Sequence, residues 1–115
     1  MALTLVQSRA QAGNSTSPNV TLFSPPTAGN LIVVSFMAND DLGGLSISGV
    51  SSGYTLLPDG SVENANDVHM WSYFKIAEVG ELELISATID DSRRWVTAVA
   101  EYNDSAGGVW GVDKT

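Results

Sequence analysis

His69 is the only histidine in the chain, and this limits the enzyme chemistry that the sequence can support. A serine nucleophile needs a base beside it, and a histidine metal site needs more than one imidazole. His69 lies in an alternating stretch that is typical of a strand, where we expect a surface imidazole. The sequence therefore predicts neither a catalytic residue nor a cofactor.

Two aspartate pairs, Asp40-Asp41 and Asp90-Asp91, are the other groups that could do chemistry. Carboxylates held about 5 to 9 Å apart can hydrolyse glycosides, and oxygen clusters in loops can bind calcium. Neighbouring aspartates at strand ends are more often solvated turn formers. We expect turn residues at both places, with calcium as the only metal for which these four residues are candidates.

The aromatic stretch from Asp67 to Ala77 gives the clearest indication of binding, because successive strand side chains point to opposite faces. We expect one row to face the core, namely Val68, Met70, Phe74 and Ile76 with Ser72. The opposite row would then form a contact surface, namely His69, Trp71, Tyr73 and Lys75. Exposed rings can stack on sugars or anchor a protein interface. The predicted contact residues are Leu3, Leu5, Trp71, Tyr73 and Trp110, whereas Trp95 is expected in the core.

Composition argues against several classes of protein. Thirteen acids against five bases give a net charge of −8, which disfavours nucleic acid as a partner. The longest apolar run, Leu31 to Ala38, is far shorter than the ~20 residues that cross a bilayer, so we expect no membrane segment. The chain has no cysteine, so disulfides and thiolate metal sites cannot contribute. The N-terminus lacks the basic start and apolar region of a secretion signal, and we expect synthesis in a cytoplasm.

Short apolar or alternating segments follow one another along the chain, separated by Gly, Pro, Asn and Asp. These segments are residues 3–10, 19–23, 31–38, 45–50, 53–57, 67–77, 81–90, 93–102 and 109–112. Pro58-Asp59-Gly60 is predicted to be a turn. No helical period extends over 11 residues. The sequence predicts one all-β domain over residues 1–115, an antiparallel, jelly-roll-like β-sandwich of about eight short strands.

Four motifs give the chain a family resemblance. They are Pro26–Val34, with its Gly-Asn-Leu entry to an apolar strand, Gly53-Tyr54-Thr55, Trp71–Ala77 and Val99–Asn103. In this order they resemble a β-sandwich module of bacteriophage virion proteins, similar to jelly rolls of tail appendages, fibres and head-decorating proteins. The resemblance covers residues 27–103 and implies no catalytic residue. Such modules often continue further, so we expect either a compact version or a sheet edge completed by a neighbouring chain.

The leading hypothesis is a non-enzymatic structural protein of a virion, a capsid-decorating or tail-associated jelly roll. Its partners would be other virion subunits and further copies of itself, a trimer being one expected symmetry, and it would act through multiplicity. The alternative is a carbohydrate-binding module in which Trp71, Tyr73 or Trp110 stacks on sugar rings. A calcium-dependent adhesion domain using the two aspartate pairs is a third hypothesis.

Overall fold

The structure, a computed structural model, describes residues 3–39, 45–64 and 68–104. Its regular elements are all strands: β1 (Leu3–Ser15), β2 (Asn19–Thr21), β3 (Leu31–Asn39), β4 (Ile47–Ser48), β5 (Thr55–Asn64), β6 (Val68–Ile76), β7 (Leu84–Ser86), β8 (Thr88–Ile89) and β9 (Arg93–Asp104). Within these ranges there is no helix that could cross a membrane.

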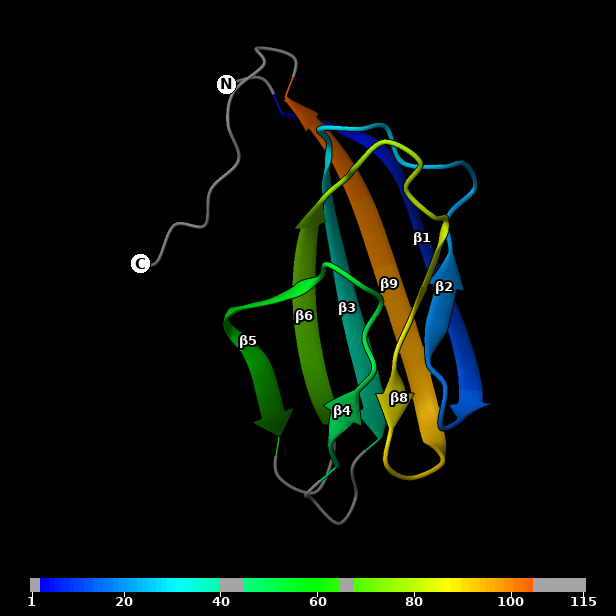
Figure 1. The fold of residues 1–115 in the computed structure, drawn as a ribbon. Coiled ribbons are helices and arrows are strands. Elements are labelled where there is room, and N and C mark those ends of the chain that lie inside the picture. The colour runs from blue at the N-terminus through cyan, green and yellow to red at the C-terminus, as the bar shows by residue number, and fades with distance from the viewer. Residues whose placement is uncertain (1–2, 40–44, 65–67, 105–115) are drawn as a thin grey trace.

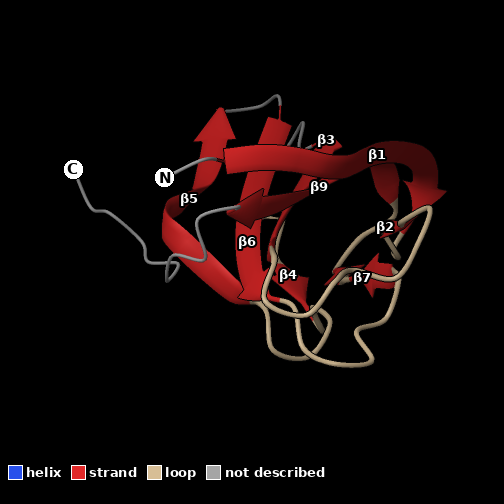
Figure 2. Cartoon of the chain, turned by 90° about the horizontal axis from the view of Figure 1, so that it is seen from above, coloured by secondary structure: helices blue, strands red, loops and turns tan. Residues whose placement is uncertain are grey.

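The strands form two layers (Figures 1 and 2). The large sheet has five antiparallel strands in the order β1-β9-β3-β6-β5, and the second layer contains the pairs β2-β7 and β4-β8. Residues 84–90 link these pairs: Ala87 N donates to Pro18 O and Ser51 N donates to Ser86 O, each over 3.0 Å. The predicted all-β antiparallel sandwich is confirmed.

The hydrophobic core lies between the layers. The large sheet supplies one side of it, with Ile32, Val34, Phe36, Trp71, Trp95 and Val99, all at most 6% exposed. The second layer supplies the other side, with Val20, Leu22, Leu45, Ile85, Ala87 and Ile89. The burial of β3 alternates strictly, which identifies its even-numbered residues as the row that faces the second layer. We call this side of the large sheet the inner face.

Long polar side chains of β1 close one edge of the sandwich. Arg9 donates from Nη1 to the carbonyl of Thr21 over 2.9 Å, and Gln11 Oε1 accepts the Thr21 N–H over 2.8 Å. Gln7 bonds both the N–H and the carbonyl of Ser24. These side chains satisfy backbone groups of β2 and the following residues that no strand pairs, as buried or half-buried polar groups require.

A buried carboxylate, that of Glu101, holds the turn that precedes β3. Glu101 is 1% exposed and accepts three hydrogen bonds: from Gln7 Nε2 over 2.7 Å, Thr27 N over 2.9 Å and Asn30 Nδ2 over 2.7 Å. Asn30 Oδ1 also accepts from Asn103 Nδ2 over 2.8 Å. The network fixes the turn that leads into β3 against the C-terminal end of β9. Two motifs of the sequence resemblance, Gly-Asn-Leu and Glu-Tyr-Asn, therefore meet in space.

Two local predictions are wrong. The predicted turn at Pro58-Asp59-Gly60 lies within β5, where the register with β6 shifts between Leu56 and Ser61. A Cβ on Gly60 would lie 2.8 Å from the backbone oxygens of Leu57 and Ser72, so glycine serves close packing here and not a turn. Strand β1 also runs five residues beyond the predicted end, through the expected loop start at Gly13. The candidate strand at 109–112 lies outside the described residues.

We predict that Glu101→Gln lowers the free energy of unfolding by about 1–3 kcal/mol, because the new amide group would face a donor with its own N–H. Urea unfolding monitored by tryptophan fluorescence measures the change. Glu78→Gln is the matched control, since it alters net charge equally on a side chain that is 75% exposed and 3.6 Å from Lys75. Equal stability of the two variants would contradict the structural role of Glu101.

Candidate functional site

The large sheet presents an uncharged face to the outside. Four rows of side chains cross its strands on the side away from the second layer, as the pairing registers show. The rows are Ala12–Val96–Met37–Met70–Val62, Ala10–Ala98–Ser35–Ser72, Ser8–Ala100–Val33–Phe74–Thr55 and Leu5–Tyr102–Leu31–Ile76. We call these residues the outer face.

The outer face is apolar although the chain is strongly acidic. None of its residues is charged; Arg94 and the buried Asp104 lie beyond its two ends on β9. Its rim exposes large aliphatic groups, with Leu5 at 54%, Val62 at 51% and Val96 at 40%. The polar groups in its middle satisfy each other, because the hydroxyls of Ser35 and Ser72 are 2.9 Å apart.

Strand spacing gives the size of this face. Five strands about 4.8 Å apart and four rows about 6.8 Å apart cover roughly 600 Å². The largest apolar patch on a typical monomer is about 300–600 Å², and such patches are often functional. Ser8, Ser35, Ser72 and Thr55 take part of this area, so the apolar portion of the outer face falls within that range.

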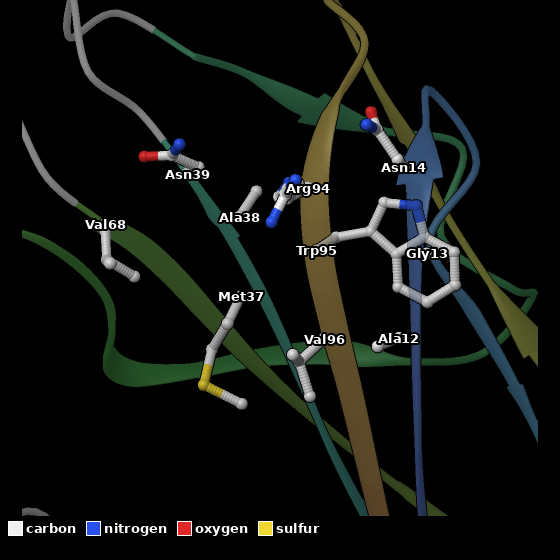
Figure 3. Close-up of a pocket in the computed structure, with 10 residues that line it drawn as sticks. All are labelled: Ala12, Gly13, Asn14, Met37, Ala38, Asn39, Val68, Arg94, Trp95 and Val96. Carbon is white, nitrogen blue, oxygen red and sulfur yellow. The ribbon is translucent and has the colours of Figure 1, made fainter.

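A shallow hollow of about 880 Å³ opens at the Arg94 end of the outer face (Figure 3). Apolar side chains from neighbouring strands line it, Met37 from β3, Val68 from β6 and Val96 from β9. Its polar rim consists of Asn14, Asn39 and Arg94, and Trp95 lies behind it with its ring against Gly13. The combination suits an apolar group that is anchored beside a hydrogen-bonding or anionic one.

The structure reverses the predicted faces of β6. Trp71 is 5% exposed and belongs to the core, and Tyr73 packs against that core with its ring 6.0 Å from Phe36. The row predicted to be buried faces outward instead, with Val68 at 40% and Ile76 at 36% exposed. Both rows contain large apolar or aromatic side chains, so alternation could not decide between them, and the larger rings fill the space between the layers.

Of the other predicted contact residues, only Leu5 has a described side chain, and it lies on the outer face. Leu3 begins β1, where the backbone alone is described, and Trp110 lies outside the described residues. Trp95 is buried as predicted, at 6% exposed, and donates from Nε1 to Ser15 Oγ over 3.1 Å.

The aspartate pairs show no cation site in the described ranges. Asp90 Oδ1 accepts the N–H of Ser46 over 2.9 Å, and Asp91 pairs with Arg93 over 2.8 Å. Across residues 3–39, 45–64 and 68–104, no three acids or histidines cluster as metal ligands would. Asp40 and Asp41 lie outside these ranges.

His69 is engaged on the inner side of β6. Its ring stacks on Trp71, with centroids 4.0 Å apart and planes 16° apart, and its Nε2 is 2.9 Å from Ser61 Oγ. Among the described residues, the Ser61 hydroxyl beside this imidazole comes closest to the arrangement of a nucleophile and its base. The half-buried ring packs on the Trp71 indole, which indicates a packing role.

A second cluster with chemical potential surrounds Lys75 at the end of the sandwich. Its ammonium lies 2.9 Å from Glu81 and 3.1 Å from the carbonyl of Ser52, and 5.6 Å from the centre of the Tyr54 ring. Lys75 and Glu81 are 12% and 7% exposed. Burial, and secondarily the Glu81 carboxylate, raises the pKa of the Tyr54 phenol well above its usual range.

Sequence reasoning missed the outer-face residues of β3 and β9, above all Val33, Met37 and Val96. A signal for β3 was present, because the run from Leu31 to Ala38 is apolar on both of its faces. A strand of that kind needs cover on both sides. For β9 the signal is weak, since two of the four residues in its outward row, Ala98 and Ala100, are alanines.

We predict that Tyr54→Phe leaves stability at pH 7 within about 1 kcal/mol, because the phenol oxygen is buried without a hydrogen-bond partner among the described residues. Folding raises the pKa of Tyr54. The contribution of its neutral phenol to the free energy of unfolding is therefore complete below about pH 10 and is lost as the pH rises above that value. The variant should therefore lose less stability than the native chain between about pH 9 and 11. Chemical denaturation across this range measures it.

Tyr102→Phe removes a phenol from the outer face and serves as the control. It should keep the alkaline loss that Tyr54 causes. Identical pH profiles for the native chain and Tyr54→Phe would show that the Tyr54 phenol has no such role.

Comparison of the chain with protein-family models, with curated proteins and with solved structures finds no match. The resemblance of residues 27–103 to a bacteriophage module therefore depends on the short motifs quoted above. The outer face is the feature of the described residues that most needs a partner.

Proposed function

We propose that this protein is a non-enzymatic structural component of a viral particle, a capsid-decorating or tail-associated sandwich that attaches to neighbouring virion subunits through its outer face. The observation that carries the proposal is the uncharged outer face on a chain of net charge −8. The sequence resemblance supports the virion as the setting. The outer face supports a protein surface as the partner.

The shape of the outer face favours a macromolecular partner over a small ligand. A small ligand is usually held in a concave site that buries most of its surface. Here a broad sheet offers roughly 600 Å², close to the ~800 Å² that each partner contributes to a stable protein interface. A modest contact of this size becomes strong when many copies bind one lattice.

The distribution of charge gives the attached molecule an orientation. Exposed acids lie in loops beside the second layer, among them Glu78, Asp90 and Asp91. Attachment through the outer face would keep these carboxylates in water and so avoid the free-energy cost of desolvating them. The second layer would then form the exterior of the particle.

The carbohydrate-binding alternative receives less support from the described residues. A stacking platform needs accessible rings, whereas Trp71 is buried and Tyr73 packs against the core. Trp110, the third ring of that hypothesis, lies outside the described residues. A calcium-dependent adhesion domain has the engaged carboxylates of Asp90 and Asp91 against it.

We predict that Val96→Asp reduces incorporation of the chain into particles at least tenfold, because a carboxylate would lose its solvation within the contact. Quantitative mass spectrometry of virions purified from the source of this chain measures the number of copies per particle. Thermal unfolding of the isolated variant establishes that it still folds.

Val79→Asp is the matched control, since it makes the same substitution at a loop residue that is 93% exposed. It should be incorporated like the native chain. Virions that lack the native chain, or that retain both variants equally, would overturn the proposal.

A further inference from the structure

Strand β1 is an edge strand whose regular part, residues 7–15, lacks the usual protection. Among the described strands it pairs with β9 alone, and it is thirteen residues long. It contains no proline, lysine or carboxylate, and its one charged residue, Arg9, is bound to the carbonyl of Thr21. Such an edge is a template for pairing with another strand.

The opposite edge of the large sheet is protected. Strand β5 contains Pro58, and its register with β6 shifts between Leu56 and Ser61. Proline and irregular register are two devices that discourage pairing at an edge. The contrast between the two edges singles out β1.

We propose that β1 pairs antiparallel with β1 of a second copy of this chain, so that two large sheets join into one. The regular part of β1 runs from Gln7 to Ser15, after the register shift that follows Leu5, and its midpoint is Gln11. A two-fold axis at Gln11 pairs the greatest length of regular strand. Such an interface is self-complementary and closes at two subunits.

The side chains fit this register. On the outer side it places Ala10 opposite Ala12 and Ser8 opposite Asn14, which are small or polar pairs. On the inner side it places Arg9 opposite Gly13, which keeps the two arginines apart. Arg9 donates to the Thr21 carbonyl and Gln11 accepts the Thr21 N–H, which fixes these side chains inward and leaves the outward row available to a partner.

Two further observations favour a second copy over a foreign strand. Strand β1 has no acid, although the chain has thirteen, so two copies can meet there without repulsion between carboxylates. The joined sheet also places two outer faces side by side, which doubles the surface proposed to attach to a particle. The pairing itself does not depend on that attachment.

Cysteine cross-linking tests the register directly, because the chain contains no cysteine. Opposite residues of an antiparallel pair have Cβ atoms about 4.5–5.5 Å apart, whereas diagonal neighbours lie about 7–8 Å apart. A mixture of Ala10→Cys and Ala12→Cys chains should therefore form the mixed disulfide at least tenfold faster than either chain alone. Mild oxidation followed by mass spectrometry measures these rates.

The controls separate this interface from other contacts. Val62→Cys, on the protected edge, should not cross-link with itself above the rate of Val79→Cys in its exposed loop. In sedimentation velocity the native chain and Val96→Asp should both dimerise with concentration, and Ala12→Lys should remain monomeric. Circular dichroism establishes that each variant keeps its strand content.

A native chain that is monomeric at every concentration would overturn the inference. So would a dimer that cross-links equally at all positions, or one that Ala12→Lys leaves intact. Each of these results is independent of whether virions contain the chain, so the two proposals can fail separately.

Discussion

Strand β3 occupies the middle of the large sheet and carries apolar side chains on both of its faces. Its even-numbered residues, such as Val34 and Phe36, are covered by the second layer. The second layer cannot also cover Val33 and Met37, because these point the other way. Strands β6 and β9 extend the same condition across the sheet, since their outward rows are also apolar or small. The architecture thus satisfies one side of β3 and leaves the other side for a partner.

Polar side chains, and not strand ladders alone, hold the two layers in position. Glu101 joins the turn before β3 to β9, and Gln7 connects that carboxylate to β1 and to Ser24. Because Glu101 is buried, its hydrogen bonds must all be made together, and a half-satisfied network would cost stability. This requirement explains how a cysteine-free chain with a small second layer can fix its long loop between β2 and β3.

The sequence was sufficient for the fold class, because apolar periodicity and turn residues act locally. It was insufficient for the faces of β6, where Met70 and Phe74 compete with Trp71 and Tyr73 and the decision depends on the volume between two layers. The role of Glu101 was also beyond it, since Asn30 and Gln7 are 71 and 94 residues away along the chain. At Pro58 a strong local turn signal yielded to pairing with β6. The outer face could most nearly have been predicted, because the apolar residues on both faces of β3 already indicated a strand that needs cover on two sides.

The alternation of tasks along β1 has a consequence for how this protein can change over evolutionary time. Gln7, Arg9 and Gln11 are committed to backbone groups in the other layer, so substitution there would open the sandwich. Ser8, Ala10 and Ala12 between them carry no such duty and are exposed. A lineage could therefore exchange every second residue of this strand and acquire new associates while retaining its architecture. An insertion of one residue would instead exchange the inward and outward sets of side chains, and both the hydrogen bonds to the other layer and the outward surface would be lost.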